Sequence, residues 1–172
     1  MKKPLFLFVL IFSCVVNYGQ SLKKYPIGES GCSLYMYCDP GKFGVSFSED
    51  SSKIYTAECS NEEVGYGLIC VKLLEAVNDS ARSEQLLIAY LDYLKTAFKI
   101  NSSVGYGKGH TLRRNPSVHG VLDYWEDQDK NKWKIMGWTD GAFINVLYAY
   151  SKKELPYTKV NVFLEGIVFP AK

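Results

Sequence analysis

The sequence predicts an α+β fold in which one long and one short helix pack on an antiparallel β-sheet. Three observations support this prediction. Ser80–Asn101 has helical periodicity over its whole length, whereas strand-like apolar segments lie on both sides of it. Glycine, proline and asparagine separate those segments, as is typical of strands joined by turns. A second, shorter helical pattern follows Pro156.

The chain begins with a pattern typical of a secretory signal peptide. Two lysines precede an apolar run that is too short for a transmembrane helix, which needs about 20 apolar residues. We expect cleavage after Gly19. Residues 1–19 would then be the signal peptide, and residues 20–172 a single globular domain that is secreted or periplasmic.

A lipid anchor is the alternative for this N-terminal segment. Ile11–Cys14 would then be a lipobox, and the protein would be attached to a membrane through acylated Cys14. Phe12 is bulky for that motif, and the apolar run continues beyond the cysteine. We therefore favour cleavage after Gly19.

Charge gives no reason to expect nucleic acid as a partner. The whole chain has 20 basic and 18 acidic residues. Removal of residues 1–19 takes away two lysines and no acidic residue, so 18 basic residues then balance 18 acidic ones. A surface without net charge does not generally attract nucleic acid or anionic lipid.

Four cysteines remain after the predicted cleavage, and in an oxidising compartment we expect them to form two disulfides. They are Cys32, Cys38, Cys59 and Cys70, and three pairings are open. Cys59 and Cys70 flank a predicted strand–turn–strand, which would bring them within bridging distance. Cys32 and Cys38 would lie about 20 Å apart in an extended chain. The spacings are too long for the short knuckles of structural zinc, so we expect no metal or cofactor.

Before the long helix, the sequence predicts an irregular lead-in over Ser21–Gly31 and then four strands. These strands are Ser33–Cys38, Phe43–Ser48, Lys53–Cys59 and Tyr66–Leu74. The long helix has an apolar face, on which Leu87, Leu91, Leu94 and Phe98 recur at helical spacing. Ser80 or Ser83 is expected to cap its N-terminus.

After the long helix, Ser102–Ser117 is expected to be a connection that leads into a three-stranded meander. Its strands are Val118–Glu126, Lys132–Thr139 and Ala142–Tyr150. Asp140-Gly141 predicts the last hairpin turn. The short helix should face inward through Val160, Phe163 and Leu164, and Ile167–Phe169 should form a final strand.

Several of these patterns recur together in one known family. They are the alternating Phe43–Phe47 strand, the Tyr66–Leu74 strand before the long helix, Gly120 at the start of the meander, the Phe163-Leu164 helix and the Ile167–Phe169 strand. In this order of elements the chain resembles the PsbP-like fold family, which includes photosystem extrinsic subunits and DcrB-type envelope proteins. The resemblance implies an α/β sandwich, with helices on the faces of an antiparallel sheet, that binds other proteins without catalysis.

A basic cluster in the connection is a weak candidate binding site. It consists of Lys108, His110, Arg113 and Arg114, which together could hold an anion or an acidic partner. The glycines around it suggest a phosphate-binding loop, but such a loop follows a strand and opens a helix, whereas this segment follows a helix. A solvated loop explains the cluster as well.

No catalytic motif is present in the sequence. It lacks G-x-S-x-G, H-E-x-x-H and C-x-x-C, and its histidines are His110 and His119. Asp127, Asp129 and Asn131 imitate the start of a calcium loop, but Lys132 stands where that loop needs glycine. A polar hairpin tip explains these residues better. We expect a protein that is not an enzyme.

We therefore expect a non-catalytic secreted or periplasmic binding protein, with another envelope or secreted protein as its partner. An accessory subunit or an inhibitor would fit, because tyrosine and tryptophan are abundant. The alternative is a small-molecule or lipid-binding domain whose pocket is lined by Tyr90, Tyr93, Trp133 and Trp138. A hydrolase would require a histidine hydrogen-bonded to a carboxylate inside a cleft.

Overall fold

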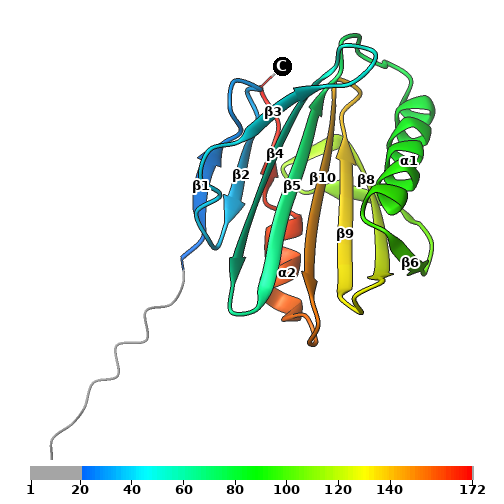
Figure 1. The fold of residues 1–172 in the computed structure, drawn as a ribbon. Helices are drawn as coiled ribbons and strands as arrows, with labels where there is room; N and C mark the ends of the chain where they lie inside the picture. The colour runs from blue at the N-terminus through cyan, green and yellow to red at the C-terminus, as the bar shows by residue number, and fades with distance from the viewer. Residues whose placement is uncertain (1–20, 172) are drawn as a thin grey trace, which may run out of the picture.

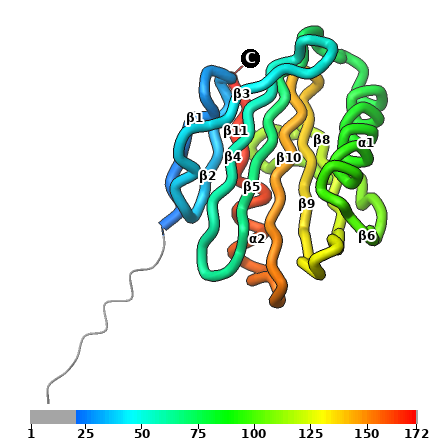
Figure 2. Tube along the Cα trace, in the orientation of Figure 1, coloured from blue at the N-terminus to red at the C-terminus, as the bar shows by residue number. Residues whose placement is uncertain are grey.

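A computed structural model describes residues 21–171, which form two antiparallel sheets and two helices (Figures 1 and 2). In spatial order, the large sheet consists of β3 (Gly44–Phe47), β4 (Lys53–Asn61), β5 (Val64–Lys72), β10 (Phe143–Ser151), β9 (Lys132–Thr139), β8 (Asn115–Asp127) and β6 (Ile100–Ser103), with β7 (Gly107–Leu112) also paired to β8. The small sheet consists of β1 (Lys23–Pro26), β2 (Ser33–Met36) and β11 (Ile167–Val168). The predicted signal peptide and the alternative anchor at Cys14 lie outside the described residues.

The predicted fold class, an α/β sandwich with two helices on one antiparallel sheet, is wrong. Strands hold 48% of the described residues and helices 17%, and the strands form two sheets. The predicted lead-in Ser21–Gly31 contains β1, and the predicted connection Ser102–Ser117 contains β7 and the end of β6. These strands expose most of their side chains, so they lack the apolar alternation by which a strand is recognised in a sequence.

The centre of the large sheet is buried on both faces. Successive residues of β5 point to opposite sides, so Leu68 and Cys70 join one apolar cluster and Ile69 and Val71 join the other. The long helix α1 (Ser80–Ala97) covers one face. The small sheet and the short helix α2 (Tyr157–Leu164) cover the other, as Figure 1 shows.

The predicted apolar faces of both helices are confirmed. The buried residues of α1 include Leu87, Leu91 and Leu94, and Phe98 packs against the same cluster from the C-cap position. The buried residues of α2 are Val160, Phe163 and Leu164. Each helix therefore faces the sheet with the residues that its periodicity indicates.

The N-cap of α1 differs from the prediction. Asp79 occupies that position, and its Oδ1 accepts a hydrogen bond from the backbone N of Arg82 at 2.7 Å. The hydroxyl of Ser83 donates to the carbonyl of Ser80 within the first turn. Asp79 is as good a cap as serine, and the apolar periodicity alone does not distinguish neighbouring polar residues.

A glycine in the large sheet fixes where α2 packs. The ring of Trp138 lies over Gly120, where a Cβ would come within 2.3 Å of the indole. In this position the Trp138 Nε1 donates a hydrogen bond of 2.8 Å to the carbonyl of Leu164, the last residue of α2. Any side chain at Gly120 would push the indole away and break this anchor.

We predict that Leu91→Ala destabilises the fold by about 2–5 kcal/mol, because this fully buried side chain would leave a cavity between α1 and the sheet. Urea denaturation measures the loss. Leu86→Ala is the matched control, since Leu86 lies on the same helix with 39% of its surface exposed, and it should cost about 1 kcal/mol or less. Similar losses for the two variants would contradict the packing of α1.

Candidate functional site around Lys134

Two neighbouring strands form the floor of the main candidate site. The antiparallel register of β8 and β9 places Tyr124 opposite Lys134 and Glu126 opposite Lys132. Because each strand alternates, these four side chains lie on the face of the sheet that α2 covers. We call the space above them the Lys134 pocket.

Helix α2 and the segment before it form the wall of the Lys134 pocket. Leu155, Tyr157 and Val160 line it on this side, and Val104 lies at the opposite rim beyond β6. The pocket has a volume of about 460 Å³ and is open to solvent. It exists because α2 is short and does not extend over the outer strands of the sheet.

Lys134 is the unusual residue of this pocket. Only 8% of its surface is exposed, and its Nζ donates a hydrogen bond of 2.6 Å to Asn161 Oδ1. The same Nζ lies 5.3 Å from the ring centre of Tyr124 and 5.0 Å from that of Tyr157. Within residues 21–171, no carboxylate forms an ion pair with it, so a buried ammonium is held by one amide oxygen and two aromatic rings.

The carboxylates near the pocket have other partners. Glu154 forms an ion pair with Lys132, and Glu126 pairs with Lys130 at 2.9 Å. Both carboxylates line the pocket, but within the described residues neither forms an ion pair with Lys134. An anion that entered the pocket would meet it directly.

The first turn of α2 adds to this positive character. The helix begins after Pro156, no side chain caps its N-terminus, and its first turn contains no acidic residue. Tyr157, the first residue of the helix, lines the pocket. The positive end of the helix dipole therefore lies at the pocket rim and also favours an anion there.

The predicted basic cluster does not form one site. Lys108 lies on β7 and pairs with Glu84 of α1 at 3.3 Å. His110 follows on the same strand and is half-buried. Arg113 and Arg114 lie in the turn between β7 and β8, where they line a second pocket of about 420 Å³. The structure thus distributes these residues over two places, and their binding role stays a prediction.

The aromatic residues proposed for a ligand pocket are not brought together either. Trp138 is buried beneath α2, whereas Trp133 and Tyr90 belong to the cluster beneath α1. Tyr93 points outward from α1 with 64% of its surface exposed. Trp133 and Trp138 are five positions apart on one strand, which places them on opposite faces.

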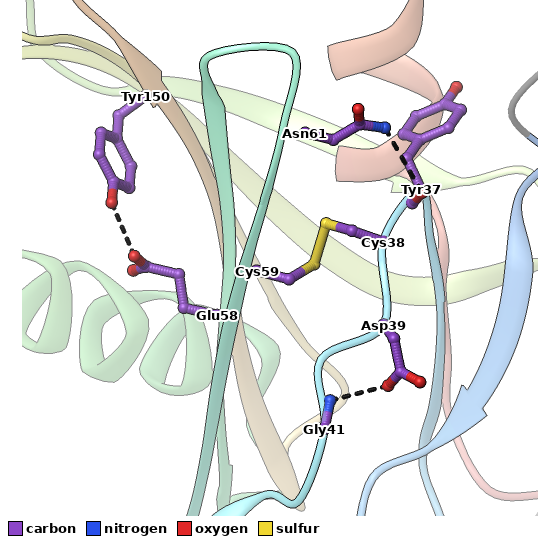
Figure 3. Close-up of a disulfide and its surroundings, with 8 residues drawn as sticks. All are labelled: Tyr37, Cys38, Asp39, Gly41, Glu58, Cys59, Asn61 and Tyr150. Carbon is purple, nitrogen blue, oxygen red and sulfur yellow. Dashed lines mark hydrogen bonds between the residues drawn. A yellow bond between two sulfur atoms is a disulfide. The ribbon is translucent and has the colours of Figure 1, made fainter.

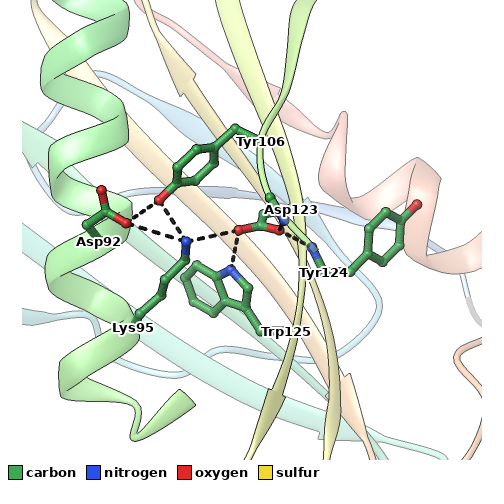
Figure 4. A network of polar contacts seen from close by, with 7 residues as sticks. Asp92, Lys95, Tyr106, Asp123, Tyr124 and Trp125 are labelled. Atoms are coloured by element: carbon green, nitrogen blue, oxygen red, sulfur yellow. Dashed lines mark hydrogen bonds and ion pairs between the residues drawn. The ribbon is translucent and has the colours of Figure 1, made fainter. Parts of the chain in front are cut away.

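A polar network joins α1 to β8 on the face opposite the Lys134 pocket (Figure 4). Asp123 is fully buried, and its Oδ2 accepts a hydrogen bond of 2.6 Å from Trp125 Nε1 and pairs with Lys95 Nζ at 3.3 Å. The other oxygen accepts from the backbone N atoms of Gly105 and Tyr124. Both oxygens of this carboxylate are therefore saturated, which fits a structural role better than acid–base chemistry.

Tyr106 connects this network to the surface of α1. Its hydroxyl donates to Asp92 Oδ1 at 2.5 Å and accepts from Lys95 Nζ at 2.8 Å. Desolvation raises the pKa of Tyr106, and the hydrogen bond to Asp92 adds to this effect, although Lys95 opposes it. Tyr106 therefore stays protonated and fastens the loop before β7 to the helix.

The acidic residues at the end of β8 form a hairpin tip, as predicted. Asp127 Oδ1 accepts from the backbone N of Asn131 at 2.9 Å. Its Oδ2 accepts from Asn131 Nδ2 at 2.7 Å and from Trp133 Nε1 at 2.9 Å. These contacts close the turn between β8 and β9.

The structure contains one disulfide where the sequence predicted two, in a pairing that the sequence left open. It joins Cys38, just after β2, to Cys59 of β4, with a Cα–Cα distance of 5.9 Å (Figure 3). Cys59 therefore does not pair with Cys70 across the β4–β5 hairpin; Tyr55 is the residue opposite Cys70. Cys32 and Cys70 are buried thiols. A bonded pair is compatible with an extracellular location.

Comparison of the sequence with family models and with curated proteins gives no relative from which a function could be transferred. No family model and no curated protein matches this sequence. The resemblance to the PsbP-like fold family is therefore untested and stays a prediction. Among the described residues, no helix is long and apolar enough to cross a membrane.

Sequence reasoning did not identify the Lys134 pocket. Lys134 lies between Trp133 and Ile135 in the predicted strand Lys132–Thr139, where it resembles an ordinary polar interruption. Tyr157 and Asn161 are one helical turn apart on α2, which is the one signal available. Nothing local indicates that this helix face meets Lys134.

We predict that Asp123→Ala destabilises the fold by about 3–5 kcal/mol, because it leaves Lys95 and the Trp125 indole without their buried partner. Asp92→Ala, which removes the exposed carboxylate of the same network, should cost about 1 kcal/mol or less. Urea denaturation compares the two variants. Equal losses would show that burial does not distinguish the two carboxylates.

Proposed function

We propose that this chain is a non-catalytic binding protein that holds an anionic group of a partner protein in the Lys134 pocket. The observation that carries the proposal is the buried ammonium of Lys134, which has two aromatic rings around it and no ion pair within the described residues. A carboxylate of the partner, from an acidic side chain or a C-terminus, would complete this site.

Burying a charge without a counter-ion costs free energy. A lysine ammonium removed from water without a counter-ion costs free energy that the rings and Asn161 return only in part. An apolar side chain at position 134 would avoid that cost. An anion that binds in the pocket offsets that cost, because a charge-assisted hydrogen bond in a partly dry pocket is stronger than one in water.

The rim of the pocket favours a protein partner. Tyr157 is 74% exposed, Tyr124 42% and Val104 82%, so apolar and aromatic surface surrounds a charged centre. Tyrosine is enriched in protein interfaces because its ring buries a large area while its hydroxyl still binds water or a polar partner. Elsewhere in the described residues, the buried apolar side chains form two clusters.

The partner is expected outside the cytoplasm. The Cys38–Cys59 disulfide fits an oxidising compartment, and the N-terminal pattern of the sequence predicts export as a secreted or periplasmic protein. The occupant of the pocket would then be another envelope or secreted protein.

A small anionic molecule is the second candidate occupant. The pocket volume of about 460 Å³ lies in the range of small-ligand sites. Such a molecule would place its anionic group on Lys134 and its apolar part between the two tyrosines. This alternative uses the same residues and differs only in the size of the occupant.

We predict that N-acetyl-phenylalanine, a small mimic of a protein C-terminus, binds at least about tenfold more tightly than its neutral amide. The difference is the charge-assisted contact with Lys134, worth about 1.5–3 kcal/mol. Nuclear magnetic resonance titration of the ¹⁵N-labelled protein measures both affinities. The largest shifts are expected at Tyr124, Lys134 and Tyr157.

Lys134→Met should remove the preference for the acid while preserving the fold, because methionine fills a similar volume without charge. Lys53→Met is the matched control, since Lys53 also lies over a tyrosine ring, 5.3 Å from the centre of Tyr55, but outside the pocket. Equal binding of acid and amide would refute the proposal. Shifts centred on Arg113 and Arg114 would instead favour the predicted basic cluster.

Affinity capture from the envelope fraction distinguishes the two occupants. A protein retained by the wild type and by Lys53→Met, but not by Lys134→Met, would identify a protein partner. Capture that does not depend on Lys134, together with carboxylate binding that does, would favour the small-molecule alternative.

A further inference from the structure

Cys32 and Cys70 are two free cysteines that share one buried cluster. Both lie in the apolar cluster beneath the small sheet, with 2% and 0% of their surfaces exposed. Each thiol is near enough to the other to affect its pKa, and the backbone N of Cys32 donates a hydrogen bond of 3.0 Å to the Ser30 hydroxyl. One sulfur atom therefore lies just before β2 of the small sheet, and the other lies on β5 of the large sheet.

The Cys38–Cys59 disulfide holds the segment that contains β2 against the β4–β5 hairpin. β2 lies between Cys32 and Cys38, and Cys38 is bonded to Cys59 of β4. In the β4–β5 hairpin, Cys59 lies opposite Tyr66, which is four residues before Cys70. One cysteine therefore lies at each end of β2, Cys32 before it and Cys38 after it. The β4–β5 hairpin carries the other two, Cys70 and Cys59.

We propose that Cys32 and Cys70 form a second disulfide by thiol–disulfide exchange with a small or protein-borne disulfide. The thiolate of Cys32 attacks one sulfur of the donor and releases the first donor thiol. The Cys70 thiol then attacks the Cys32 sulfur of the mixed disulfide and releases the second. The donor is reduced to two thiols, which take the two protons, while the protein gains one S–S bond.

Access and environment assign the attacking role to Cys32. It lines a surface pocket of about 320 Å³ beside β1, whereas Cys70 is fully enclosed. The hydrogen bond from Cys70 lowers the pKa of Cys32, and Ser30 and Asn145 add to this effect against the opposing influence of burial. The hydrogen bond with Cys32 and burial raise the pKa of Cys70.

A buried amide supports the same assignment. Asn145 lies opposite Cys70 in the β5–β10 register and is fully buried. Within the described residues, neither its side-chain nitrogen nor its oxygen has a hydrogen-bond partner of ordinary geometry. An amide beside the Cys32 sulfur is suited to donate to a thiolate, which gives this otherwise costly residue a role.

To test this, the folded full chain is treated with oxidised glutathione. Its free thiols are then alkylated in denaturant, and the peptides are mapped by mass spectrometry. We expect Cys32 and Cys70 to be linked and protected from alkylation, alongside Cys38–Cys59. Peptide mapping also distinguishes Cys14 from the other four cysteines. Both thiols remaining alkylatable, or Cys32 linked to another cysteine, would overturn the proposal.

Single substitutions test the order of the two steps. Cys70→Ala should trap glutathione on Cys32, whereas Cys32→Ala should leave Cys70 unmodified because nothing exposes it. Glutathione on Cys70 in Cys32→Ala would overturn the assignment of roles. Near-ultraviolet circular dichroism confirms that each variant is folded. The oxidised wild type should also unfold at a higher temperature than the Cys32→Ala/Cys70→Ala variant, because the bond joins the two sheets.

Discussion

The structure depends on the double burial of β5, β9 and β10. Almost every residue of these strands is buried, so neither face of the sheet centre can meet water. Each face needs its own cover, and one helix is enough for only one of them. The small sheet and α2 supply the second cover, which explains why a three-stranded sheet and an eight-residue helix pack side by side on one face.

The positions of the Lys134 pocket and of the Cys38–Cys59 disulfide both follow from this second cover. Where it ends, beyond α2, the face of β8 and β9 is left open and Lys134 lies in the gap. Where it begins, at β2, the small sheet is fastened to the hairpin of β4 and β5 by Cys38–Cys59. Strand β8 links the two faces, because Tyr124 points toward α2 while Asp123 and Trp125 point toward α1 (Figure 4).

The sequence predicted those elements whose residues are selected by burial. The helix face with Leu87 and Leu91, the inward residues of α2 and the meander of β8, β9 and β10 all carry an apolar period, and all are confirmed. It did not predict β1, β6 or β7, because exposed edge strands are held by backbone hydrogen bonds that leave little trace in side-chain pattern. Sheet membership is likewise set by contacts distant in sequence, so the second sheet was missed.

Lys134 shows how a local inconsistency can indicate function. Its neighbours along β9 are apolar, and its neighbour on β10 is Ala149, which leaves space beside it. A methionine or leucine would fill that space without burying a charge, so stability alone does not explain a lysine there. Asn145 is the parallel case beneath the small sheet, a buried amide without an ordinary partner next to two thiols. In both places the residue is costly in isolation and useful once an anion forms or arrives beside it, which is the pattern expected where function overrides packing.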